Sequence, residues 1–183
     1  MGADIHVDGR VPIVRGVPRF VPDDAYVSSF SFEWNTHKRT QLDSHRGDDM
    51  SMGTFQQKTG FTDADLRGKL VLDAGVGTGR FTEVMTRLGA RVIGVDLSLA
   101  VEAAQENLGG RDDVLIAQAD IGKLPFAPGT FDYIVSIGVL HHTPDTRKYF
   151  HALVPLLKPG GTICIWVYPH GGDFKAPKPW IPF

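Results

Sequence analysis

The chain has 183 residues, enough for one domain of ordinary size, and its 42% hydrophobic and 22% charged content is typical of a globular protein. A net charge of -2 predicts no nucleic-acid partner, because phosphate binding requires a clustered basic excess. The single cysteine, Cys164, excludes an internal disulfide and a cysteine-rich zinc site, so we expect no metal. We expect no membrane partner and a cytoplasmic location, because the sequence has no apolar run of spanning length and no signal peptide.

The chain divides into three parts that differ in composition and in the pattern of apolar residues. Residues 1–49 are irregular, polar and aromatic, residues 50–168 alternate apolar runs with helical patterns, and residues 169–183 form a tail rich in proline and glycine. We therefore predict one main domain over residues 50–168, which begins with a short helix over residues 50–58.

Aromatic side chains recur at every second position in one stretch of the first part. Phe30, Phe32 and Trp34 follow this spacing, so one face of an extended segment there is aromatic. Two interpretations stay open. The face packs against the edge of the domain, or it forms a lid that excludes water from a bound ligand.

Five short apolar runs in the main domain predict β-strands. They cover residues 70–73, 91–96, 114–117, 131–137 and 162–167. Because the runs alternate with helical patterns, we expect right-handed crossovers and a parallel sheet that is buried on both faces. The predicted fold is therefore α/β, a Rossmann-like doubly wound parallel sheet. Ligands of such sheets bind beyond the carboxyl ends of the strands.

Helical patterns lie between these runs. Residues 80–88 place apolar side chains at the spacing of one helical face. Ser98 is expected to cap the next helix. Thr143 is expected to cap a third helix, with Pro144 at its first position, and Pro155 is expected to kink or end that helix.

A glycine-rich turn follows the first predicted strand and leads directly into a helix. It reads Asp73-Ala74-Gly75-Val76-Gly77-Thr78-Gly79-Arg80. Glycines allow a ligand to approach the backbone, and a helix N-terminus attracts a carboxylate or a phosphate. A tight turn without a ligand is the structural alternative. The dinucleotide fingerprint G-x-G-x-x-G would place its third glycine at position 80, which is Arg80.

This turn resembles motif I of the class I S-adenosylmethionine-dependent methyltransferases, a G-x-G-x-G loop after an acidic residue. Further matches follow in chain order: Asp96 at the second strand end, Asp120-Ile121 at the third, the F-D-x-V-x-S-x-x-V-L-H-H pattern of residues 131–142, and the turn of residues 158–161 (Lys-Pro-Gly-Gly) before the fifth strand. The resemblance implies a fold and a cofactor, S-adenosylmethionine, with S-adenosylhomocysteine as the product.

The resemblance also implies which residues bind the cofactor. Near its methionine part we expect Asp73, Gly75, Val76, Gly77 and Gly79; near the ribose and one adenine edge, Asp96 and Leu97; beside the adenine, Asp120 and Ile121; and at its amino group, the backbone of Ser136 or Ile137. A carboxylate suits the ribose because it can accept two hydrogen bonds from a vicinal diol. Each acidic residue also has a structural alternative, such as capping its own turn or the following helix.

Two adjacent histidines follow the fourth strand, beside the expected position of the reactive methyl group. His141 or His142 is therefore a candidate catalytic base, because histidine titrates near neutrality and can accept a proton from a hydroxyl nucleophile. The alternative is a histidine that bonds to backbone within its loop. Many methyl transfers need no base, because alignment with an activated sulfonium supplies most of the acceleration.

The resemblance implies an enzyme that methylates an O, N or C nucleophile of a small-molecule acceptor. Residues 136–139 lack the Pro-Pro-aromatic motif of base and glutamine N-methyltransferases, which disfavours those acceptors. Two alternatives stay open. One is a truncated, inactive domain that binds the cofactor and serves as a partner module, and the other is a nicotinamide-dependent oxidoreductase, against which Arg80 argues.

The two ends of the chain depart from the family pattern. Residues 9–22 resemble a short hairpin that precedes some bacterial methyltransferase domains, but the zinc-ribbon cysteines of relatives are missing, so we expect no metal there. At the other end, 16 residues follow Val167, fewer than the usual C-terminal hairpin requires. We expect the fold to lack that hairpin, so that the chain is a fragment or a homo-oligomer covers the open sheet edge.

Overall fold

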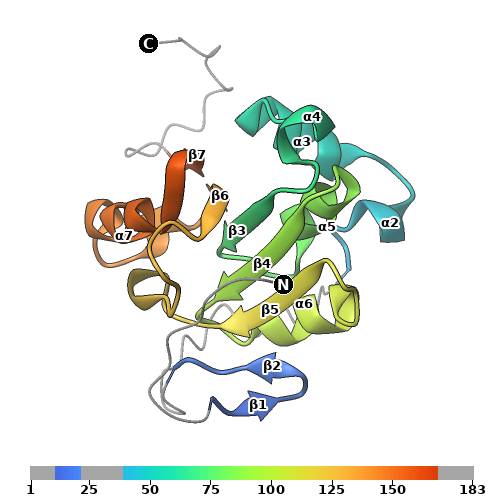
Figure 1. Cartoon of the computed structure of the whole chain (residues 1–183). Helices are drawn as coiled ribbons and strands as arrows, with labels where there is room; N and C mark the ends of the chain where they lie inside the picture. The colour runs from blue at the N-terminus through green and yellow to red at the C-terminus, as the bar shows by residue number, and fades with distance from the viewer. Residues whose placement is uncertain (1–10, 22–38, 169–183) are drawn as a thin grey trace.

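The computed structural model describes residues 11–21 and 39–168. One parallel sheet has the strand order β5-β4-β3-β6-β7. Its strands are β3 (Leu70–Ala74), β4 (Arg91–Asp96), β5 (Val114–Gln118), β6 (Phe131–Ile137) and β7 (Leu157–Trp166). The chain runs from β3 outward to β5 and then returns to place β6 on the other side of β3 (Figure 1). This reversal confirms the predicted doubly wound α/β fold.

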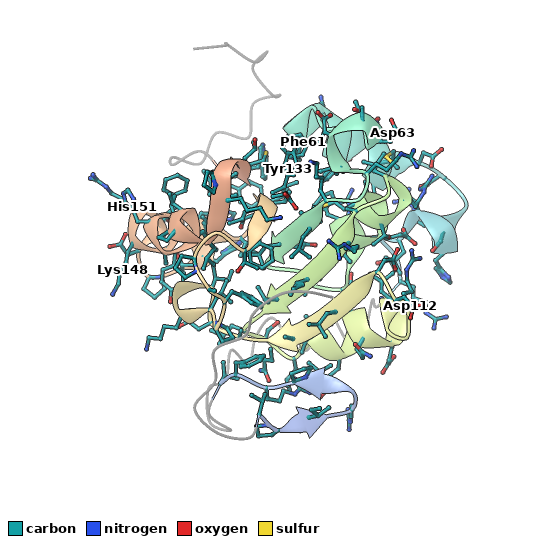
Figure 2. The ribbon with its side chains drawn as sticks, viewed as in Figure 1. Phe61, Asp63, Asp112, Tyr133, Lys148 and His151 are labelled. Carbon is teal, nitrogen blue, oxygen red and sulfur yellow. The ribbon has the colours of Figure 1, made fainter. Side chains whose placement is uncertain are left out.

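Helices cover both faces of the sheet. One face carries α3 (Met50–Thr59), α4 (Asp63–Leu66), α5 (Arg80–Arg87) and α6 (Ala100–Leu108), and the other carries α7 (Thr146–Leu153). Side chains alternate along each strand, so Val71 and Val135 are buried against α3 and α5, whereas Leu72 and Ile134 are buried on the α7 side. Phe61 and Tyr133, labelled in Figure 2, extend the α3 side with an edge-to-face contact at 5.1 Å.

Two helices have an N-cap residue other than the one predicted. The N-cap of α6 is Leu99, one residue after the predicted Ser98. The Ser98 hydroxyl still accepts the amide of Ala100, the first residue of the helix, at 3.3 Å while it donates to Asp96 Oδ1 at 2.8 Å. At α7 the N-cap is Asp145, whose carboxylate accepts the Lys148 amide at 2.9 Å. The Thr143 hydroxyl, predicted to cap this helix, instead donates within the preceding turn.

The start of the fifth strand also differs from its prediction. Pro155 ends α7 as expected, and a short 3-10 turn, η3 (Val154–Leu156), leads directly into β7. Residues 158–161, predicted as a separate turn, lie within this strand. They fit there because Phe131 pairs with Leu157 but Tyr133 pairs with Thr162, an irregularity that absorbs the extra residues.

A small hairpin near the N-terminus covers the β5 edge of the sheet. It consists of β1 (Ile13–Val14) and β2 (Val17–Pro18), joined by Arg15 and Gly16 at positive φ, and lies beside β5 in Figure 1. Val17 is fully buried against α6 and β5. The aromatic positions Phe30, Phe32 and Trp34 and the tail of residues 169–183 lie outside the described residues. Within the described ranges, no helix has the length and apolarity to cross a membrane.

Candidate functional site

The glycine-rich turn lies over the carboxyl end of β4. The Gly75 and Val76 amides donate to the Val95 carbonyl at 2.8 and 2.9 Å, which fixes the turn to that strand. Gly75 has φ +100°, and a Cβ there would collide with the Val139 side chain. Gly77 also has positive φ, but no atom of the described residues, apart from its two chain neighbours, lies within 4 Å of where its Cβ would stand. The backbone of Gly77 is therefore open to an approaching ligand.

The last glycine of the turn closes it against α6. Gly79 is the N-cap of α5 with φ +94°, and a Cβ there would stand 2.5 Å from Leu108 Cδ1. The Val76 side chain is buried in the same α6 cluster. Gly79 and Val76 thus fix the turn, whereas Gly77 leaves it accessible.

Asp96 ends β4 directly beside the turn. Its Oδ2 accepts the Gly77 amide at 3.0 Å, while its Oδ1 accepts the Ser98 amide and hydroxyl at 2.9 and 2.8 Å. These three donors orient a carboxylate that is still partly exposed. Leu97, the next residue, is also partly exposed, and its carbonyl accepts a hydrogen bond from Gln118 Nε2 at 2.8 Å.

The third strand end brings a second carboxylate to the same edge. The Ala119 amide donates to the Asp96 carbonyl at 3.0 Å, and Asp120 follows as the N-cap of η1 (Ile121–Lys123). Asp120 Oδ1 accepts the Gly122 amide at 2.8 Å and is partly exposed. Ile121, the next residue, is 7% exposed and is buried in the core cluster on the α7 side of the sheet. Asp96 and Asp120 therefore lie on neighbouring strand ends, as predicted.

Two polar side chains among the predicted cofactor residues, those of Asp73 and Ser136, also face the interior. Asp73 is 3% exposed and accepts the Thr82 hydroxyl at 2.6 Å, and burial, assisted by the charge of Asp96, raises its pKa to about 6. Ser136 is fully buried, and its hydroxyl donates to the Ala74 carbonyl at 2.8 Å. Both side chains form hydrogen bonds in the interior, next to the turn. Ser136 can therefore contact a ligand only through its backbone.

Of the two histidines, only one has a shielded side chain. His142 is exposed, whereas both ring nitrogens of His141 are buried and have no hydrogen-bond partner among the described residues. Burial, and then the neighbouring His142, lowers the pKa of His141. The Tyr168 ring lies edge-on to His141 at 4.5 Å. Burial therefore favours the neutral form of His141, in which one ring nitrogen can accept a proton.

Two cations near this edge were not expected from the sequence. Lys58, in the last turn of α3, holds its ammonium 3.0 Å from the Trp166 ring centroid at the end of β7, and Trp166 pairs with the partly exposed Ile137. Arg80 Nε donates to the Ser51 hydroxyl at 3.0 Å, which ties α5 to α3. Burial and the charge of Arg80 lower the pKa of Lys58. No periodicity links Lys58 to Trp166, so only the folded chain shows the pair.

Comparison with known proteins identifies the family of the part of the chain that forms this edge, and it agrees with the resemblance found in the sequence. The methyltransferase domain family matches residues 72–165, just over half of the chain. A ubiquinone biosynthesis O-methyltransferase of Nitrosococcus oceani is 37% identical over 107 residues, which are 55% of this chain and 44% of that protein. A demethylmenaquinone methyltransferase of Thermobifida fusca is 34% identical over 127 residues, 62% of this chain and 54% of that protein.

A solved structure shares the fold. A candidate S-adenosyl-L-methionine-dependent methyltransferase of Methanococcus maripaludis superposes with a TM-score of 0.61 at 20% identity, covering 76% of this chain and 65% of that one. The chain spans about half the length of the curated relatives it matches. The family match, rather than this structural likeness, decides the assignment. The chain belongs to the methyltransferase domain family, among the class I S-adenosylmethionine-dependent methyltransferases.

Proposed function

We propose that this protein transfers the methyl group of S-adenosylmethionine to an O, N or C nucleophile of a small-molecule acceptor and releases S-adenosylhomocysteine. One observation carries the proposal: the open backbone of Gly77 donates directly to the carboxylate of Asp96, at the edge where β3 and β4 end. A nucleoside with an amino-acid tail needs this combination, an uncrowded backbone for the tail and an oriented carboxylate for the diol.

We assign the parts of the cofactor to the strand ends in order. The methionine part lies along Gly75, Val76, Gly77 and Gly79, with Asp73 supporting the turn from the interior. Asp96 and Leu97 hold the ribose and one adenine edge, and Asp120 with Ile121 flanks the adenine. The cofactor amino group meets backbone at Ser136 or Ile137, where β6 ends.

The acceptor then lies on the remaining side, above the ends of β6 and β7. Its nucleophile attacks the methyl carbon in line, and the carbon–sulfur bond breaks with its electron pair left on sulfur. His141 receives the proton when the nucleophile is a hydroxyl, because its buried nitrogens have no other partner among the described residues. Lys58 places a positive charge on the same side, which favours an acceptor oxygen that becomes negative.

The relatives' names support a small acceptor. One is named for ubiquinone biosynthesis and the other for demethylmenaquinone, so phenols and quinone-derived compounds form the first acceptor panel. The proposed test combines calorimetric titration with S-adenosylhomocysteine and transfer of radiolabelled methyl from S-adenosylmethionine to that panel. We expect binding and transfer. Binding without transfer to any acceptor would identify a binding module instead, and absence of binding would overturn the proposal.

A further inference from the structure

We infer that the N-terminal hairpin is part of the cofactor site, with Arg19 as a positioning residue that fixes the two loops around the nucleoside. The inference rests on the proposed function, since the loops are those assigned above to ribose and adenine. It assigns a role to the hairpin, which precedes the residues matched by the family.

Arg19 leaves the hairpin and turns back into the protein. Its side chain is 8% exposed, its Nη1 donates to Gln118 Oε1 at 2.9 Å, and its Nη2 donates to Glu102 Oε1 at 2.9 Å. The backbone follows the same path, because Arg19 forms a parallel bridge with Gln118 and the Phe20 amide donates to the Gln118 carbonyl at 2.8 Å. The hairpin is thereby joined to the end of β5 by both backbone and side chain.

Gln118 connects the hairpin to the loops after β4 and β5 that we assign to the ribose and the adenine. Its Nε2 donates to the Leu97 carbonyl at 2.8 Å, so one buried amide connects the loop after β4 with the residues before Asp120. A guanidinium can only donate, so Arg19 can face only the oxygen of the Gln118 amide. The nitrogen of that amide must then face Leu97. Arg19 therefore fixes the orientation of the Gln118 side-chain amide.

Removing the guanidinium would have a specific consequence. The Gln118 oxygen would become a buried acceptor without its donor, and the amide could rotate away from the Leu97 carbonyl. The loop that carries Asp96 and Leu97 would then lose its hydrogen bond from Gln118, while its hydrogen bond to the glycine turn would remain. Arg15, whose side chain is exposed, forms an ion pair with the other oxygen of Glu102 at 2.5 Å. It shares this carboxylate with Arg19 but donates no hydrogen bond to Gln118 in the described residues, so it is the control for a charge lost from the hairpin while the Gln118 amide keeps its donor.

The first experiment is calorimetric titration of the full chain with S-adenosylhomocysteine. Arg19→Met retains the aliphatic stem and removes the donors to Gln118 and Glu102. We expect its Kd to rise about 5- to 10-fold, the effect of losing the hydrogen bond from Gln118 to Leu97 that orders the cofactor loop. Arg15→Met should leave the Kd within about twofold, because an exposed ion pair contributes little. Arg19→Lys should restore part of the affinity, because it returns one donor.

A second variant tests the series of contacts from Arg19 through Gln118 to Leu97, even if Arg19→Met does not fold. Gln118→Glu retains an acceptor for Arg19 but removes the donor to Leu97, so the hairpin stays attached while the last link is broken. We expect its Kd to rise by a similar factor. Hydrogen–deuterium exchange should accelerate at the Leu97 and Ser98 amides in both variants and stay unchanged in β6 and β7.

Linkage supplies a test in the unmutated chain. If the hairpin favours cofactor binding, S-adenosylhomocysteine must in turn slow exchange across residues 17–20. A wild type that binds the ligand without protecting this segment, or an Arg19→Met variant that binds as the wild type does, would overturn the inference and leave the proposed function standing. A wild type that fails to bind would overturn both.

Discussion

At the scale of single residues, Asp73 shows how burial makes a carboxyl sensitive to pH. Its pKa rises from 3.8 to about 6, first because it is buried and then because Asp96 is near, while the Thr82 hydroxyl opposes the rise. The folded chain therefore holds a proton more tightly than the unfolded chain. The stability this provides is complete below about pH 4 and is lost as the pH rises through 6, a loss of about 3 kcal/mol.

Asp73→Asn should remove this pH dependence. The amide oxygen can still accept the Thr82 hydroxyl, but it cannot titrate. Between pH 4 and pH 7 we expect the unfolding free energy of the wild type to fall by about 2 kcal/mol more than that of the variant, as measured by urea denaturation. Asp113→Asn is the control, because Asp113 is paired with Arg111 and its pKa is lowered. Parallel pH profiles of wild type and Asp73→Asn would contradict the account.

His141 yields a kinetic prediction. If it is the base for a hydroxyl acceptor, His141→Ala should lower kcat/KM by about 100-fold, whereas the exposed His142 should tolerate alanine with a few-fold loss. Because burial lowers the pKa of His141, the acidic limb of the kcat/KM profile should lie below the ordinary histidine value of 6.5. Equal losses in the two variants, or a limb above that value, would argue against this base.

Strand-end residues could be predicted from the sequence, and long-range pairs could not. Asp96 and Asp120 end neighbouring strands of a parallel sheet, and such ends always meet at one edge. The inward direction of Asp73 depends on Thr82 packing behind it. Lys58 over Trp166 depends on how α3 meets β7, which no local pattern in the sequence indicates.

At the scale of elements, the glycine turn has one position where stability and binding can be separated. Gly77 and Gly110 both have positive φ, and the part of the chain that the structure describes places no atom within 4 Å of a Cβ added at either position. Alanine at either position should cost about 1 kcal/mol of unfolding free energy, from the strained backbone alone. Only Gly77→Ala should weaken S-adenosylhomocysteine, by 10-fold or more, because its methyl group occupies the approach to the backbone. Calorimetry and thermal melting of the two variants measure both quantities, and equal binding would refute the assigned approach.

Strands and helices followed their apolar periodicity, but caps and strand ends did not follow local composition. Thr143 and Asp145 are both acceptable N-caps, and the turn η2 (Leu140–His142), which uses the Thr143 hydroxyl, decides between them. Lys-Pro-Gly-Gly is typical of a turn, yet residues 158–161 are strand because β6 offers an irregular partner. Pairing partners set such boundaries, and a single sequence does not show them.

At the scale of the whole molecule, ligand binding should stabilise the fold as a unit. A ligand that binds only the folded chain adds about 2.7 kcal/mol when its concentration is 100 times its Kd. S-adenosylhomocysteine bridges the ends of β3, β4 and β5 in the proposed site, so it should raise the melting temperature of the sheet and the hairpin together. NADH should not, because Arg80 stands where a dinucleotide site needs its third glycine.

The variant that isolates this effect is Asp96→Asn. It removes a charged acceptor of the ribose and one acceptor of the turn, so we expect the S-adenosylhomocysteine-dependent rise in melting temperature to be largely lost. The unliganded melting temperature should change less, because the Ser98 contacts can be kept by the amide oxygen. Differential scanning calorimetry of both proteins with each ligand measures these shifts. An undiminished rise in Asp96→Asn would show that the nucleoside binds elsewhere. A rise of the melting temperature with NADH would favour the dinucleotide interpretation instead.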